Sequence, residues 1–210
     1  MRFLNKVFGF FFPSICTCCK EPLVRGEKMI CLDCLFHLSI SPKDNACFDF
    51  KRDERIRTIV HQFKYKRNRP LAFYAGKLMA HRLARSGALK GVDALIPVPI
   101  STKKERKRGY NQTYWLAKGI HEVLGVPVEN RVLLRRNEWL GEISQASRTH
   151  EERRKTSSDV FYIKNAHLLE NKCVLVVDDV ITSGTTMNNC CTVLAQIPHI
   201  RVKKMAFSSA

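Results

Sequence analysis

Apolar positions change their period along the chain, and each change marks a predicted element. Between Asp53 and Arg85 they recur at helical spacing, which predicts two helices interrupted near Asn68–Pro70. Asn111–Leu124 has the same spacing, and Gly125 after it is a typical helix stop. Short apolar runs predict buried strands. They lie at Asp93–Val98, Val160–Ile163, Cys173–Val177 and Val202–Phe207.

Strands that alternate with helices predict an α/β fold with a parallel sheet. Thr185–Leu194 fits this order as the helix after a strand. Two stretches lack periodicity: Phe3 to Asp44, which is punctuated by Cys and Pro, and Arg135–Ser158, a polar segment predicted to be a long mobile loop. We therefore expect a small module at residues 1–44, a helical linker or hood at 45–90 and an α/β domain at 91–210.

The charge balance narrows the class of partner. The chain has 36 Lys and Arg against 19 Asp and Glu, a net charge of +17. Such an excess favours polyanions such as nucleic acid, whereas an anionic membrane surface, a phosphorylated substrate or simple solubility are the alternatives. The apolar run Val7–Phe12 is too short to span a bilayer. We expect a cytoplasmic protein without a membrane span.

A chemically specific segment follows the strand Cys173–Val177. Two carboxylates, Asp178 and Asp179, precede a turn rich in hydroxyls that opens a helix. The unsatisfied N–H groups of a helix N-terminus bind phosphate, and Gly184 permits close approach. Adjacent carboxylates accept hydrogen bonds from vicinal hydroxyls. The pattern predicts a ribose-phosphate site, with helix capping and turn formation as the alternative. The predicted phosphate ligands are Thr182, Ser183, Gly184, Thr185 and Thr186.

The segment Asp178–Thr186 resembles the phosphoribosyl pyrophosphate motif of type I phosphoribosyltransferases. Ile96–Ile100 and Arg108–Gln112 are similar to the hallmark of the ComF family, the phosphoribosyltransferase-like competence proteins. The resemblance implies a type I phosphoribosyltransferase-like sheet flanked by helices, with a bound phosphoribosyl compound and Mg²⁺. It implies a loop around the diphosphate formed by Arg108, Gly109, Asn111 and Gln112, and a mobile loop that closes over it with Gln145, Arg148 and Arg153. Thr156 departs from the Asn that the family often has.

Four cysteines predict a small metal module. Cys16 and Cys19 form one CxxC pair and Cys31 and Cys34 another, which suits a closed tetrahedral Zn²⁺ site of structural type. Cys18 is an alternative ligand to Cys19, and disulfides are the alternative to a metal. The other cysteines are predicted to be buried thiols.

A possible nucleic-acid surface follows the module. The run Lys51–Arg69 holds eight Lys or Arg, interleaved with Phe63, Tyr65 and nearby Tyr74, as in surfaces that bind single strands. Alternatively, these rings pack on the sheet.

Two functional hypotheses result. One is a protein that binds a phosphoribosyl compound and single-stranded DNA during DNA uptake, alongside a competence helicase or recombination loader as the family resemblance implies. The other is a Mg²⁺-dependent phosphoribosyltransferase. No residue stands out as a catalytic acid or base, and the acceptor is unknown.

Overall fold

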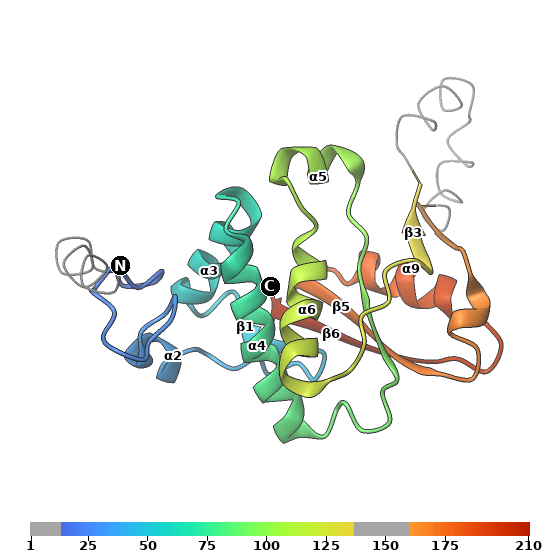
Figure 1. Cartoon of the computed structure of the whole chain (residues 1–210), viewed down its shortest axis with the longest axis horizontal. Coiled ribbons are helices and arrows are strands. Elements are labelled where there is room, and N and C mark those ends of the chain that lie inside the picture. Colours follow the sequence, from blue (N-terminus) through green and yellow to red (C-terminus); the bar gives the residue numbers. More distant parts are fainter. Residues whose placement is uncertain (1–13, 137–159) are drawn as a thin grey trace, which may run out of the picture.

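A four-stranded parallel sheet forms the centre of the molecule (Figure 1). The computed structural model describes residues 14–136 and 160–210. The sheet order is β1-β6-β5-β2. These strands are β1 (Ala46–Asp49), β2 (Ala94–Pro97), β5 (Cys173–Ile181) and β6 (Arg201–Ser209).

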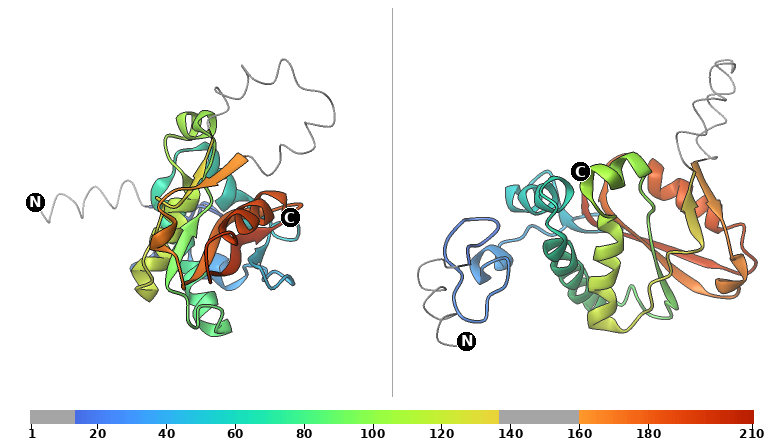
Figure 2. Two further views of the ribbon diagram at one scale, coloured as in Figure 1. Left: turned by 90° about the vertical axis from the view of Figure 1, so that its right-hand side faces the viewer. Right: turned by 45° about the horizontal axis from the view of Figure 1, so that its top comes forward.

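Helices and a β-ribbon cover the two faces of the sheet (Figure 2). One face packs against α3 (Glu54–Tyr65), α4 (Arg69–Ser86) and α6 (Gln112–Leu124). The other face packs against α9 (Thr185–Leu194) and the antiparallel ribbon of β3 (Leu133–Arg135) and β4 (Phe161–Ile163). Side chains alternate along β5, so Leu175 and Val177 join the first core, whereas Val174 and Val176 join the second. The short elements are α2 (Leu32–Phe36), α5 (Thr102–Arg108) and the 3-10 turn η2 (Ala166–Leu168).

Two glycines set the distance between α4 and α6. A Cβ atom on Gly76 would lie 2.1 Å from the carbonyl oxygen of Leu116, and one on Gly119 would lie 2.1 Å from that of Phe73. Both distances are far below van der Waals contact, so the two backbones touch only because neither residue has a side chain. This close crossing brings the N-terminal end of α6 next to the end of α3.

The observed elements confirm most of the predicted ones. The helix break at Asn68 is real, because Asn68 caps α4 through its Oδ1 atom. β4 forms where a strand was predicted, but it pairs antiparallel with β3 and lies outside the parallel sheet. The strand β5 continues through the two aspartates to Ile181, beyond its predicted end at Val177, because its ladder with β6 continues. Strand β1, whose four residues complete the sheet edge, was not predicted.

The cysteine-containing module packs against α3 at the end of the molecule opposite the β3–β4 ribbon (Figures 1 and 2). Cys16, Ile30 and Leu38 belong to the same buried cluster as the residues of α3 and α4. The module is therefore continuous with the first core. Within residues 14–136 and 160–210, no helix is long and apolar enough to cross a membrane.

Candidate functional site

The two aspartates of β5 lie on opposite faces of the sheet. Side chains alternate along a strand, so Asp179 points toward α3 and α6, whereas Asp178 points toward α9. Asp179 is 4% exposed, and Asp178 is half-buried. The two aspartates are chemically identical neighbours in the sequence, but in the fold they differ in burial and in the face of the sheet they occupy.

Asp179 is held by two side chains from other elements. Its Oδ1 atom lies 2.9 Å from Nζ of Lys64, at the end of α3, and its Oδ2 atom accepts a hydrogen bond of 2.7 Å from Nε2 of Gln112. Lys64 is itself largely buried, with 17% of its side chain exposed. A buried carboxylate needs a paired charge and hydrogen bonds, and both are present here. Asp179 is therefore fixed in place as a neutralised ion pair.

Asp178 has a different electrostatic environment. Burial and the neighbouring Asp179 raise its pKa to about 7, although Lys64, Lys104 and a 2.8 Å hydrogen bond from the N–H group of Asp179 act in the opposite direction. Desolvation disfavours the charged form of a carboxyl group, and a nearby like charge adds to this effect. Asp178 is thus the less stabilised carboxylate of the pair.

The turn after β5 leads into α9 without a side-chain cap. Gly184 occupies the N-cap position at φ 79°, a left-handed conformation that favours glycine. The side chains of Thr182, Ser183, Thr185 and Thr186 are exposed, and the hydroxyls of Ser183 and Thr185 lie 3.0 Å apart. An uncapped helix N-terminus presents N–H groups with partial positive charge. This end of α9 is suited to an anion.

The predicted basic loop after β2 contains a helix. Ser101 caps α5 through its Oγ atom, the following residues are good helix formers, and Gly109 ends the helix at φ 79°. The resemblance implied a loop that includes Arg108, but Arg108 is the last residue of a helix, because Ser101 and Gly109 bound one that was not predicted. All seven residues of α5 are at least partly exposed, and α5 projects from the body of the molecule (Figure 1).

Residues 110–112 fix the start of α6 by hydrogen bonds. Tyr110 donates a hydrogen bond from its hydroxyl to the carbonyl oxygen of Phe63, and burial raises its pKa to about 12. Asn111 caps α6 by accepting from the N–H group of Thr113, and its Nδ2 atom donates to the carbonyl oxygen of Val98. Gln112 is 3% exposed and contacts Asp179. Of the four residues predicted to surround a diphosphate, Asn111 and Gln112 thus have side-chain hydrogen bonds within the fold, and the guanidinium carbon of Arg108 lies 5.8 Å from the ring centre of Tyr65.

The four predicted metal ligands converge. The sulfur atoms of Cys16, Cys19, Cys31 and Cys34 all lie within 4.8 Å of one another, which suits a tetrahedral metal site. Backbone N–H groups of Cys31 and Cys34 donate to the sulfur atoms of Cys16 and Cys31 at 3.3 and 3.4 Å. Burial acts to raise the pKa of Cys16, but hydrogen bonds, first that from the backbone of Cys31, lower it to about 6. This cluster can hold a metal ion.

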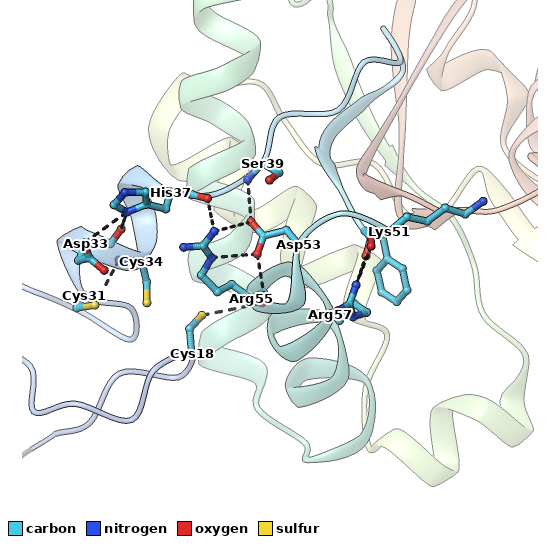
Figure 3. A network of polar contacts seen from close by, with 11 residues as sticks. Cys18, Cys31, Asp33, Cys34, His37, Ser39, Lys51, Asp53, Arg55 and Arg57 are labelled. Carbon is cyan, nitrogen blue, oxygen red and sulfur yellow. Dashed lines mark hydrogen bonds and ion pairs between the residues drawn. The ribbon is translucent and has the colours of Figure 1, made fainter.

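Cys18, the alternative ligand, points elsewhere. Its Sγ atom donates to the carbonyl oxygen of Arg55 at 3.9 Å, and burial raises its pKa to about 12 (Figure 3). All nine cysteines are free thiols, and the 3.6 Å between the sulfur atoms of Cys19 and Cys31 is well above the roughly 2.05 Å of a disulfide. The geometry therefore favours Cys19 over Cys18 and a metal over disulfides.

Hydrogen bonds from an ion pair at the start of α3 hold this module (Figure 3). Arg55 contacts Asp53 with 2.9 Å between Nε and Oδ1, and its Nη2 atom donates to the carbonyl oxygen of His37 at 2.6 Å. Asp53 also accepts from the N–H group of Ser39 at 2.8 Å. Burial acts to raise the pKa of Asp53, but the hydrogen bonds from Arg55 and Ser39 hold it below its usual range. The module and α3 are thus fixed to each other.

Comparison with known proteins agrees with this arrangement. Residues 114–203 match the model of the "Phosphoribosyl transferase domain" family. "Competence protein F" of Haemophilus influenzae is 25% identical over 151 residues, which cover 69% of this chain and 63% of that protein. "DNA utilization protein YhgH" of Salmonella typhimurium is 26% identical over 136 residues, 61% of this chain and 56% of that protein. "Competence protein ComFC" of Bacillus subtilis is 30% identical over 94 residues, 45% of this chain and 35% of that protein.

The chain is thus similar to ComF-family competence proteins, and its fold is that of a type I phosphoribosyltransferase-like domain. It aligns with less than two thirds of the length of each of these relatives.

The site contains residues that were not identified from the sequence. Lys64 was grouped only with the basic run Lys51–Arg69, and nothing in its local pattern distinguishes it from exposed Lys66. The mobile-loop residues Gln145, Arg148 and Arg153 lie outside the residues that the structure describes. Their predicted contact with a diphosphate stays a prediction.

Proposed function

We propose that this protein binds a phosphoribosyl compound, such as phosphoribosyl pyrophosphate, at the carboxyl edge of its sheet. The 5-phosphate would lie at the N-terminus of α9, and Asp178 and Asp179 would accept hydrogen bonds from the ribose hydroxyls. The observation that carries the proposal is the uncapped α9, with Gly184 at φ 79° and exposed hydroxyls, directly after the carboxylate pair. Ligands of open α/β sheets bind at this edge.

The surrounding charges support a polyanionic ligand. Lys64 neutralises Asp179, so the pair presents less negative charge to a phosphate than two free carboxylates would. Arg108 and Gly109, with Asn111 and Gln112 behind them, would face the diphosphate. The Oε1 atom of Gln112 is buried and has no hydrogen-bond partner within the described residues, so it is available to a ligand hydroxyl. Gln145, Arg148 and Arg153 would close over the diphosphate, which binds as its Mg²⁺ complex.

Calorimetric titration with phosphoribosyl pyrophosphate and Mg²⁺ tests the ribose role. Asp178→Asn combined with Asp179→Asn removes two charge-assisted hydrogen bonds, each worth about 1.5 kcal/mol or more, so affinity should fall by about 100-fold. Glu170→Gln makes the same chemical change on an exposed residue and should leave binding unaltered. Equal affinity of the double variant and wild type would rule out this role.

Binding of single-stranded DNA is a second proposed function. Of the eight cations in Lys51–Arg69, Arg52, Arg55 and Lys64 pair with aspartates, and all except Arg55 and Lys64 are exposed. Helix α5 adds five cations, four of them exposed. The names of the relatives, competence and DNA utilization proteins, support the same partner. We propose that this occurs in the cytoplasm during DNA uptake, together with a helicase or recombination loader.

The salt dependence of oligonucleotide affinity tests the DNA function. Each phosphate contact to a single strand contributes about −0.7 to the slope of log K against log salt. Lys66→Ala with Arg67→Ala should reduce the slope by about 1.4, whereas Arg201→Ala, an exposed cation on β6, should leave it unchanged. A wild-type affinity that is independent of salt would contradict phosphate contact.

The family match also favours phosphoribosyl transfer to an unknown acceptor as an alternative function. Transfer requires that cations and Mg²⁺ stabilise the departing diphosphate and needs little general acid or base. The assay is release of pyrophosphate when nucleobases or amines are added with Mg²⁺. Tight binding without release would favour the binding protein over the enzyme.

A further inference from the structure

A cleft of about 360 Å³ opens between α6, the segment after β2 and the strand β3. Three aromatic residues of the α6 region, Tyr110, Tyr114 and Trp115, line it. The guanidinium carbon of Arg69 lies 5.6 Å from the ring centre of Tyr110 and 5.2 Å from that of Trp115. Tyr114 and Trp115 are half-buried, and their rings meet edge to face at 5.9 Å. Aromatic faces and a stacked arginine are the side chains that bind planar rings.

Apart from Gly109 and Asn111, which belong to the proposed diphosphate loop, the rest of the lining suits a base better than a phosphate. Leu133 and Leu134 add an apolar wall, so that side offers no donor to an anion. Glu105 adds a carboxylate, which repels an anion and accepts hydrogen bonds from exocyclic amines. Asn130 adds an amide, which can both donate and accept. This chemistry differs from that of the uncapped end of α9, where hydroxyls and N–H groups gather.

The cations beside the cleft indicate whether the bound base is free or part of a nucleic-acid strand. Glu105 belongs to α5, and the same helix has five cations. Lys103, Lys104 and Arg106 are exposed, so they are accessible to a phosphodiester backbone. A free base has no phosphates to use these cations, but a base within a strand does.

We infer that this cleft holds a nucleobase of single-stranded DNA whose neighbouring phosphates lie along α5. The inference rests on the DNA part of the proposed function and deepens it, because it names the place where a base is bound. In this arrangement α5 contacts the phosphodiester backbone of the DNA, and the aromatic residues of the α6 region bind a base.

The fluorescence of Trp115 reports directly on the cleft. The second tryptophan, Trp139, is removed by Trp139→Phe, and the full chain is titrated with a short oligothymidylate. A base stacked in the cleft should change the emission of Trp115 saturably. An abasic oligonucleotide with the same number of phosphates should bind more weakly without that change. An equal change with the abasic strand, or no change with either strand, would overturn the inference.

A matched pair of tyrosine variants gives the energetic test. Tyr114→Ala should weaken oligothymidylate binding about tenfold, as expected for loss of one stacking contact, and Tyr114→Phe should restore it. Tyr162→Ala, which removes an exposed tyrosine on β4, should leave affinity unchanged. Thermal unfolding of each variant controls for misfolding.

The remaining outcomes distinguish the inference from the proposed function. If no oligonucleotide binds, the DNA function itself fails. If DNA binds and Tyr114→Ala behaves like Tyr162→Ala, only the cleft assignment fails. If free thymidine alters the emission of Trp115 as strongly as the strand does, the cleft is a small-molecule site. Self-association that Tyr114→Ala abolishes, measured by sedimentation, would instead make it a contact between copies.

Discussion

The cysteine cluster and the aspartate pair solve the same electrostatic problem in different ways. Both bring together groups that repel one another when ionised. At the edge of the sheet, the fold supplies the compensating cation itself, because Nζ of Lys64 lies 2.9 Å from Asp179. In the module, four sulfur atoms lie within 4.8 Å of one another, an arrangement that a bound cation stabilises.

The module also differs from the rest of the chain in net charge. Residues 14–44 contain four basic and four acidic residues, although the chain as a whole has a charge of +17. The module also exposes large apolar side chains, including 86% of Phe36 and 67% of Leu32. A small region that buries little apolar area needs another source of stability, such as a metal. The two regions should therefore respond to opposite perturbations.

Cys34→Ser should have the largest effect. Removing one thiolate opens the tetrahedral shell, so the variant should lose its bound metal, and residues 14–44 should exchange their amide hydrogens at rates near those of an unfolded chain. Elemental analysis should find about one zinc ion per wild-type chain and almost none in the variant. Cys18→Ser is the control and should retain the metal. Loss of the metal from Cys18→Ser would place Cys18 in the site, and retention of the metal by Cys34→Ser would remove Cys34 from it.

Lys64→Met should destabilise the sheet edge without affecting the metal. It leaves Asp179 buried without its cation, which typically costs about 3 kcal/mol. Urea denaturation should show this loss, whereas Lys66→Met, an exposed neighbour on the same segment, should change stability by no more than about 0.5 kcal/mol. Equal stabilities of the two variants would mean that the Lys64–Asp179 pair contributes no net stability.

Asp178→Asn should change the pH dependence of stability. The pKa of Asp178 is raised to about 7 in the folded protein, so between about pH 4 and 7 the folded state binds more protons than the unfolded state. This carboxyl group therefore lowers stability by a few kcal/mol at most as pH rises through that window. The variant should not lose this stability, and denaturation at pH 4 and at pH 8 measures the free energy of unfolding at each pH. A variant that loses stability as wild type does would contradict the raised pKa.

Arg55→Met should have the smallest effect, because it weakens only the junction between the module and α3. Asp53 keeps hydrogen bonds from the N–H groups of Ser39 and Arg55, so we expect a loss of about 1 kcal/mol. Hydrogen exchange at the amide of Ser39 should become faster. Arg52→Met, whose side chain is 79% exposed, should leave that amide unchanged. Faster exchange in both variants would show that the effect is not specific to the junction.

Elements with a strong local signal could be predicted from the sequence. The helix Thr185–Leu194 was predicted with its observed bounds, since an apolar period and a glycine at its start define it. Strand β1 was not predicted, because its apolar run Ala46–Phe48 ends at Asp49, and its pairing with β6 joins residues that are far apart in the chain. Helix α5 was missed because it buries no residue and so has no apolar period.

The sequence by itself determined the chemistry of each site, because the residues involved are near neighbours: two CxxC pairs, two adjacent aspartates, and the turn that opens α9. Only the tertiary structure decided how these residues differ from one another. Asp179 is buried and paired because α3 and α6 bring Lys64 and Gln112 to it, and Cys18 is excluded from the cluster because it faces Arg55. Local spacing specifies which donors are available, whereas burial and charge pairing depend on contacts between distant segments.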